Sequence, residues 1–212
     1  MQFASYQAFR TAVEKLIEGD DIGSTFSTAT LDLIIGLAEE RVYQGDDSTK
    51  GLRASTMVTA LSETVTANVA PLPADLLELK ELYFDGEPPL EIIPLDRLRH
   101  LVAAGSSTGD SRYAAQDGDN LIFWPEASGT VLGSYYAKPT ALESVSPWAD
   151  ATTFARYPQL FVFAALVEAM PFLGMEAKAP GWDGRYRMAL RGAEVAEAQR
   201  VYGGSPLRIR AS

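Results

Sequence analysis

Residues 156–169 read RYPQLFVFAALVEA, and this stretch decides how the rest of the chain is interpreted. Pro158 suits the first turn of a helix, because the N–H group that proline lacks would have no partner there. The residues that follow are apolar on nearly every side of a helix, which is typical of a helix buried in a core. Pro171 and Gly174 end it. The stretch therefore predicts a central, buried helix.

A second helix is expected from Trp182 to Tyr202, forming a hairpin with the first. Trp182, Tyr186 and Leu190 recur at four-residue steps, which places them on one apolar face. Charged residues, Glu197 among them, are expected on the other faces. The large side chains of the hairpin are predicted to form the core and the contacts between subunits: Leu160, Phe161, Phe163, Leu166, Trp182 and Tyr186.

Two further helices are expected near the start of the chain. One spans 6–18, and the other spans 28–44 with Ser27 as its N-cap. The apolar residues of each recur at helical spacing, so each has one face for a core. Glu39 and Arg41 are expected to cover the outside of the second helix.

The middle of the chain has the pattern of β-strands. Threonine and valine are frequent in 53–69, which we interpret as two strands. We interpret 74–77 as a helical turn and 78–84 as a strand, because Asp85-Gly86 is a strong hairpin turn, and 90–93 as the returning strand. A short helix to Ala104 and three strands separated by tight turns complete the region: 113–116, 120–124 and 130–137.

The fold class expected from these elements is α+β, with N- and C-terminal helices packed as a helical layer and a small antiparallel β-domain inserted between them. We expect four parts along the chain. They are an N-terminal helical pair at 1–50, the inserted β-domain with its short helix at 51–150, a C-terminal helix hairpin at 151–202 that packs on the N-terminal helices, and an extended tail at 203–212.

The residue types argue against an enzyme. The chain has no cysteine and one histidine, His100, which we interpret as a solvated or partly packed side chain. The Asp117-Gly118-Asp119 segment lacks the later glutamate of a calcium loop and is explained by a hairpin turn. We therefore predict no catalytic residues, no metal site and no cofactor.

The charge distribution bears on nucleic acid. The chain has 18 basic and 28 acidic residues, a formal charge of −10. Three arginines lie after residue 198, which leaves 15 basic and 28 acidic residues, a net charge of −13, in 1–198. A protein surface with this negative charge does not bind DNA phosphates, although DNA could pass along it without binding. No signal peptide or membrane span is apparent, so a soluble protein without a membrane partner is expected.

Several segments, taken in order, resemble the head-to-tail adaptor (connector) proteins of tailed bacteriophages. The resemblance covers most of the chain. Besides the N-terminal helix pair, the segments that carry it are LPADLLEL at 72–79, YFDG at 83–86, DGDNLIFWP at 117–125, GSYYAKP at 133–139, YPQLF at 157–161, WDGRY at 182–186 and GGSPLRIR at 203–210.

This resemblance implies a structural protein of the virion, made in the host cytoplasm. Such adaptors form a ring, usually of twelve subunits, under the portal protein, attach the tail or nozzle protein below, and leave a channel through which DNA passes. Two alternatives stay open. One is a tail-completion, stopper or nozzle-type protein, and the other is a module whose β-domain binds a receptor or glycan. A ring or a portal complex, rather than a free monomer, would favour the adaptor.

The last ten residues are predicted to dock on the portal. Gly203-Gly204 frees the chain from the helix, and Pro206 keeps the following residues extended. Leu207 and Ile209 alternate with Arg208 and Arg210, which is the pattern of a strand added to an exposed edge or laid in a groove. We also expect the helical ends of the chain, rather than the β-domain, to form the contacts of the ring.

Overall fold

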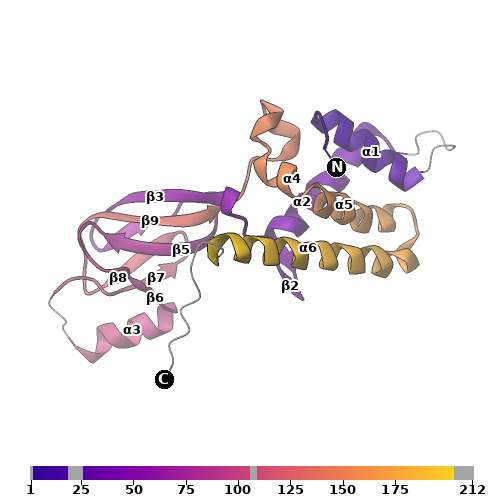
Figure 1. The fold of residues 1–212 in the computed structure, drawn as a ribbon. Helices are drawn as coiled ribbons and strands as arrows, with labels where there is room; N and C mark the ends of the chain where they lie inside the picture. Colours follow the sequence, from indigo (N-terminus) through magenta and orange to yellow (C-terminus); the bar gives the residue numbers. More distant parts are fainter. Residues whose placement is uncertain (1, 19–25, 106–108, 203–212) are drawn as a thin grey trace, which may run out of the picture. The chain divides into compact units, whose positions relative to one another are not determined.

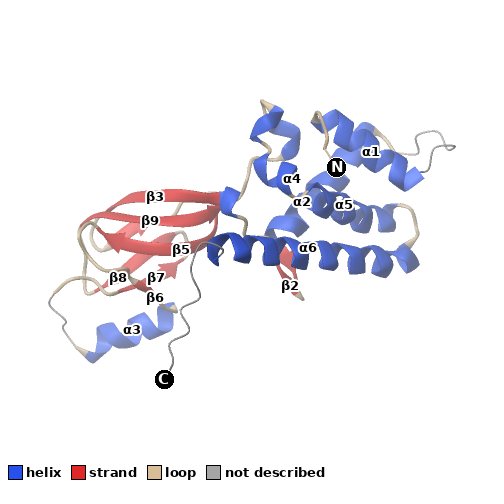
Figure 2. Cartoon of the chain, viewed as in Figure 1, coloured by secondary structure: helices blue, strands red, loops and turns tan. Residues whose placement is uncertain are grey.

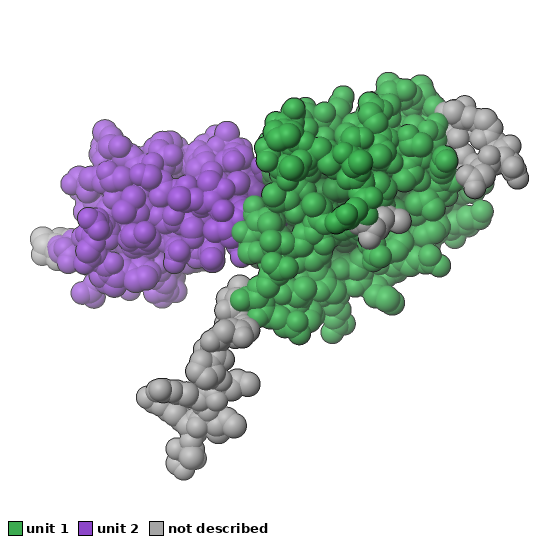
Figure 3. Space-filling model, turned by 45° about the horizontal axis from the view of Figure 1, so that its top comes forward, with its two compact units in different colours: residues 1–56, 139–212 green, residues 57–138 purple. Residues whose placement is uncertain are grey.

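The computed structural model describes residues 2–18, 26–105 and 109–202 of the 212-residue chain. The chain divides into two compact units (Figure 3). Unit 1 combines residues 1–56 with 139–212, and unit 2 is Met57–Lys138. Helices predominate in unit 1 and strands in unit 2, which confirms the α+β class (Figure 2). The insertion predicted from the sequence, 51–150, is longer than unit 2 at both ends.

Unit 1 is built around one helix. Its helices are α1 (Tyr6–Glu18), α2 (Thr28–Gln44), α4 (Thr152–Arg156), α5 (Pro158–Phe172) and α6 (Ala179–Tyr202), with short 3₁₀ turns at η2 (Leu142–Ser144), η3 (Trp148–Asp150) and η4 (Glu176–Lys178). The helices α1, α2 and α6 all pack on α5 (Figure 1). Helix α5 is therefore buried on nearly every side, as its apolar sequence predicts.

The helix ends follow from local chemistry. The Ser27 side chain caps α2 by accepting a hydrogen bond from the Thr30 N–H at 3.1 Å. Helix α5 continues one residue past Pro171, and the Leu173 N–H that follows bonds the Ala169 and Met170 carbonyl oxygens. Helix α6 begins at Ala179 rather than at Trp182, since Pro180 is tolerated in a first turn. A short hairpin, β1 (Gly45–Asp46) with β2 (Thr49–Lys50), follows α2.

Unit 2 contains two sheets and one helix. Its strands are β3 (Val58–Val65), β4 (Val69–Pro71), β5 (Leu76–Phe84), β6 (Glu91–Ile92), β7 (Tyr113–Asp117), β8 (Asn120–Trp124) and β9 (Gly129–Ala137). One sheet has the order β3-β9-β5 and the other β4-β8-β7-β6. Side chains from both sheets, including Leu82, Phe123 and Val131, share one core. The helix α3 (Leu95–Ala104) packs through Leu98 on Ala115 and its neighbours.

Three details of unit 2 differ from the prediction. The helical turn at 74–77 is wrong, because β5 starts at Leu76 and pairs with β9 along nearly its whole length. The residues after Asp85-Gly86 do not return along β5. After one bond from the Leu90 N–H to the Leu82 carbonyl, β6 pairs in parallel with β7. Strand β3 begins at Val58, after a 3₁₀ turn, η1 (Ser55–Met57).

Both connections between the units leave unit 2 at the same end of one sheet. Val58, the first residue of β3, is the antiparallel partner of Tyr136 near the end of β9. The chain enters unit 2 just before the first of these residues and leaves it just after the second. The entering and returning segments therefore start from neighbouring strands.

Candidate functional site

The core and contact residues predicted from the sequence have two different environments. Leu160, Phe161 and Leu166 are 1% exposed and lie in the core of unit 1. Phe163 and Trp182 are half-buried, and their rings stack at 6.3 Å. Within the single chain these three side chains leave little apolar surface exposed, because α1, α2 and α6 cover α5.

Tyr186, the last of these predicted residues, links α6 to α2. Its side chain is buried, and its hydroxyl donates to the Arg41 carbonyl oxygen at 3.0 Å. Burial raises the pKa of this hydroxyl to well above its usual value. Tyr186 is therefore a buried, hydrogen-bonded part of the core. The residues predicted to dock on the portal, Pro206 to Arg210, lie outside the described residues.

A buried glutamate holds the segment that leads from unit 1 into unit 2. Glu197 of α6 accepts hydrogen bonds from the Ser55 N–H at 2.8 Å and from the Tyr157 hydroxyl at 2.5 Å. Arg156 bonds both the Glu197 carboxylate, at 3.1 Å, and the Ser55 hydroxyl, at 2.7 Å. Burial alone would raise the pKa of Glu197, but these bonds outweigh it and lower the pKa to about 2. The carboxylate is therefore ionised, and it accepts hydrogen bonds from Ser55, Arg156 and Tyr157.

A second buried glutamate holds the returning segment. Both carboxylate oxygens of Glu39, on α2, accept hydrogen bonds from the Leu142 N–H at 3.1 Å. We call Glu39 and Glu197 the anchor glutamates, because each binds the backbone of a segment that joins the units. Both were predicted on outer helix faces, and both are buried. Glu197 follows Ala193 by four residues on the apolar stripe of α6, which is the signal that could have revealed it.

An ionic cluster joins α2, α5, α6 and the β1–β2 hairpin. Arg41 lies 2.5 Å from Glu168 and 3.1 Å from Asp46. Arg187 lies 2.6 Å from Asp183 and 3.4 Å from Asp46. Burial would raise the pKa of Asp46, but hydrogen bonds from Ser48 and Thr49 lower it to about 2. The prediction that Arg41 covers the outside of α2 is corrected, because it crosslinks four elements.

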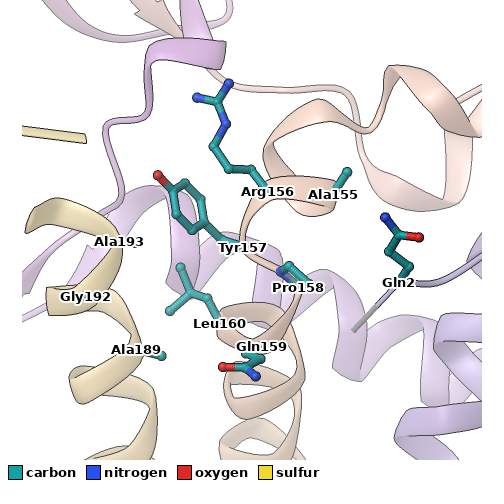
Figure 4. Close-up of a pocket in the computed structure, with 10 residues that line it drawn as sticks. All are labelled: Gln2, Ala155, Arg156, Tyr157, Pro158, Gln159, Leu160, Ala189, Gly192 and Ala193. Atoms are coloured by element: carbon teal, nitrogen blue, oxygen red, sulfur yellow. The ribbon is translucent and has the colours of Figure 1, made fainter. Parts of the chain in front are cut away.

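The first turn of α5 borders a pocket of about 590 Å³ (Figure 4). The lining residues come from the N-terminus, from α4 and α5, and from α6: Gln2, Ala155, Arg156, Tyr157, Pro158, Gln159, Leu160, Ala189, Gly192 and Ala193. Arg156 is the one ionic group among them, and it is paired with Glu197. The residues that α6 contributes to the lining are small: Ala189, Gly192 and Ala193. The lining residues include no pair that could act as general acid and general base.

The described parts of the chain contain neither a cluster of metal-ligand residues nor a membrane-spanning helix. Within 2–18, 26–105 and 109–202, no group of three or more His, Cys, Asp or Glu could hold a metal ion. The Asp117-Gly118 segment forms the tight turn between β7 and β8, with Gly118 at φ 60°. His100 is exposed on α3. No helix among the described residues has the length and apolar character needed to cross a membrane.

The polar groups described above join segments of one chain to each other. A family model described as SU10 adaptor protein matches residues 4–210. No curated protein sequence matches the chain. The chain therefore belongs to the SU10 adaptor family, a family of phage head-to-tail adaptor proteins. The resemblance identified from the sequence is confirmed.

Proposed function

We propose that this protein is a non-enzymatic component of the virion that forms a ring of twelve subunits under the portal protein. The ring binds the tail or nozzle protein below and leaves a channel for DNA during packaging and ejection. It needs no cofactor, and it is made in the host cytoplasm before it joins the particle. The observation that carries the proposal is the family match, because it spans both units of the chain.

Imaging of particles with symmetry averaging tests the proposal directly. A ring of this chain is expected between the portal and the tail, and a mixture of the protein with its portal should give a complex with the mass of both rings. A position further down the tail channel would favour a stopper or nozzle-type protein instead. A free monomer that binds a glycan or receptor through unit 2 would contradict the adaptor.

DNA is expected to pass the ring without specific binding. The reason for this expectation is the net charge of the chain, −10, which comes from 28 acidic and 18 basic residues. Like charge keeps phosphate from the protein surface, over a screening length of about 8 Å at physiological ionic strength. Mobility-shift assays of the full chain with duplex DNA at moderate salt should show no complex. Tight binding that weakens steeply with added salt would contradict this.

Removal of residues 203–212 is expected to abolish portal attachment while the protein still folds. The alternating Leu207, Arg208, Ile209 and Arg210 suit a strand that pairs with a partner's edge or groove. Ten extended residues reach about 33–36 Å, which is enough to cross to a neighbouring ring.

Two measurements check the role of the tail. Co-sedimentation with portal reports attachment, and a circular dichroism melt reports folding. A second variant keeps the length and charge of the tail but replaces Leu207 and Ile209 by serine. It should also weaken attachment to the portal. A truncated protein that attaches to portals as the full chain does would show that the docking surface lies elsewhere.

A further inference from the structure

The chain passes between the two units twice, and the two connecting segments are built differently. In the entering segment the 3₁₀ turn η1 ends at Met57, which is 3% exposed, and β3 begins at the next residue, Val58. The returning segment is longer, because β9 ends at Ala137 and residues 138–141 belong to no helix or strand. The entering segment therefore passes its direction on to β3, whereas the returning segment can change direction over several residues.

Side chains of α4 and α6 hold the entering segment up to the boundary of unit 2. The Glu197 carboxylate of α6 accepts a hydrogen bond from the Ser55 N–H at 2.8 Å, and Arg156 of α4 bonds both that carboxylate and the Ser55 hydroxyl. The next hydroxyl, that of Thr56, lies 2.8 Å from the Thr153 hydroxyl of α4. Thr56 is the last residue of unit 1 before the chain enters unit 2. Hydrogen bonds thus fix both residues that precede unit 2.

These contacts are shielded from water, since Glu197 and Thr153 are 6% and 3% exposed. Hydrogen bonds are directional, so several of them together define the direction of the segment that they hold. Breaking one of several buried hydrogen bonds leaves its groups without a partner until water enters, so such contacts hold or open together. We call Ser55, Thr56, Thr153, Arg156 and Glu197 the latch.

The returning segment is fixed to each unit by a backbone N–H group. In unit 2 the Lys138 N–H donates to the Asp75 carbonyl oxygen at 2.7 Å, and in unit 1 the Leu142 N–H donates to the Glu39 carboxylate at 3.1 Å. The residues between them, 139–141, span about 10 Å when they are extended. The returning segment therefore limits how far unit 2 can move, but it defines no direction for it.

We propose that the latch sets the orientation of unit 2, and that opening the latch lets unit 2 turn about the entering segment within the limit set by the returning segment. Opening breaks polar contacts that water then replaces, and it leaves the apolar cores of both units intact. Opening is therefore a local event that does not require either unit to unfold. The inference concerns a single chain and does not rest on the proposed ring.

Distances between two spin labels test the latch. The chain has no cysteine, so introduced cysteines are labelled without background. One label is placed at Met188→Cys on α6 and the other at Val102→Cys on α3, both at exposed positions. The labelled full-length chain is diluted into an excess of unlabelled chain, so that pulsed electron paramagnetic resonance reports distances within one chain only. A narrow distance distribution is expected while the latch is intact.

Two variants open the latch to different degrees. Glu197→Gln removes the charge that Arg156 pairs with and weakens the bond to the Ser55 N–H. Ser55→Ala with Thr56→Val removes hydroxyl contacts only and keeps Glu197, so it provides the test if Glu197→Gln does not fold. Each variant should broaden the distance distribution, and Glu197→Gln should broaden it more. The matched control is Thr140→Val, the same exchange at an exposed position of the returning segment, which should leave the distribution unchanged.

Circular dichroism melts show whether each variant is folded, and three results would overturn the proposal. A distribution as broad with the intact latch as in the variants would mean that the latch does not fix unit 2. Folded variants that keep the narrow distribution would assign its orientation to other contacts. A control that broadens the distribution as much as Ser55→Ala with Thr56→Val would assign the orientation to the returning segment. None of these results bears on the adaptor function, which imaging of particles tests separately.

Discussion

Replacing Phe161 by alanine is expected to lower the free energy of unfolding of unit 1 by about 3–5 kcal/mol. Phe161 is 1% exposed at the centre of α5. Its ring lies 5.2 Å from that of Phe154 and 5.8 Å from that of Tyr43, which ties α5 to α4 and to α2. The substitution removes a large buried surface and leaves a cavity that three helices must close.

Phe163→Ala is the matched control, two residues away on the same helix. Phe163 is half-buried and stacks on Trp182, so a smaller loss of about 1–2 kcal/mol is expected. Urea unfolding followed by far-UV circular dichroism reports the helices of unit 1. A loss for Phe163→Ala as large as that for Phe161→Ala would contradict the central position of Phe161 in the core.

Glu197→Gln is expected to remove about 3 kcal/mol of stability at neutral pH. The pKa of Glu197 is lowered from its ordinary value of 4.5 to about 2 in the folded protein. A carboxylate with a lowered pKa stabilises the fold fully above its unfolded value, and this contribution is lost as the pH falls. Glutamine keeps the shape of the side chain but leaves the Arg156 guanidinium without its buried counter-charge.

The pH dependence distinguishes this effect from a loss of packing. The difference in unfolding free energy between the wild type and Glu197→Gln should be constant from pH 7 to about 5 and should shrink towards pH 2. Glu194→Gln, an exposed change on the same helix, is the control and should change stability by less than about 0.5 kcal/mol. A difference that does not vary with pH would mean that the ionisation of Glu197 is not what stabilises the fold.

The sequence predicts the helices of unit 1 better than the sheets of unit 2. Helices α1 and α2 have both of their predicted ends, and at α2 these are set locally by the Ser27 cap and by Gly45 after the last turn. The start of β5 and the parallel pairing of β6 depend on which distant strand each one meets. Local patterns carry no information on such partners, so these two predictions were wrong.

The candidate site was harder to predict than the fold. Glutamate is mostly exposed in proteins, so Glu39 and Glu197 were assigned to outer faces, although both occupy apolar stripes. Their partners, Leu142 and Ser55, are more than a hundred residues away in sequence. Of the aromatic residues of α5, Phe161 is buried, whereas Phe163 is half-buried and Phe172 is exposed. The burial of Phe161 within a single chain depends on the other helices around α5, which no local pattern reveals.

The pairing of Val58 with Tyr136 gives the chain a modular organisation. Antiparallel partners have Cα atoms about 5 Å apart, so the two ends of unit 2 lie almost at one point. A turn of a few residues could close that gap, and a foreign domain whose termini lie equally close could replace the whole of Met57–Lys138. Changes in unit 2 can thus accumulate without any change to the helices, and exchange of this unit between related phages would need only two crossovers.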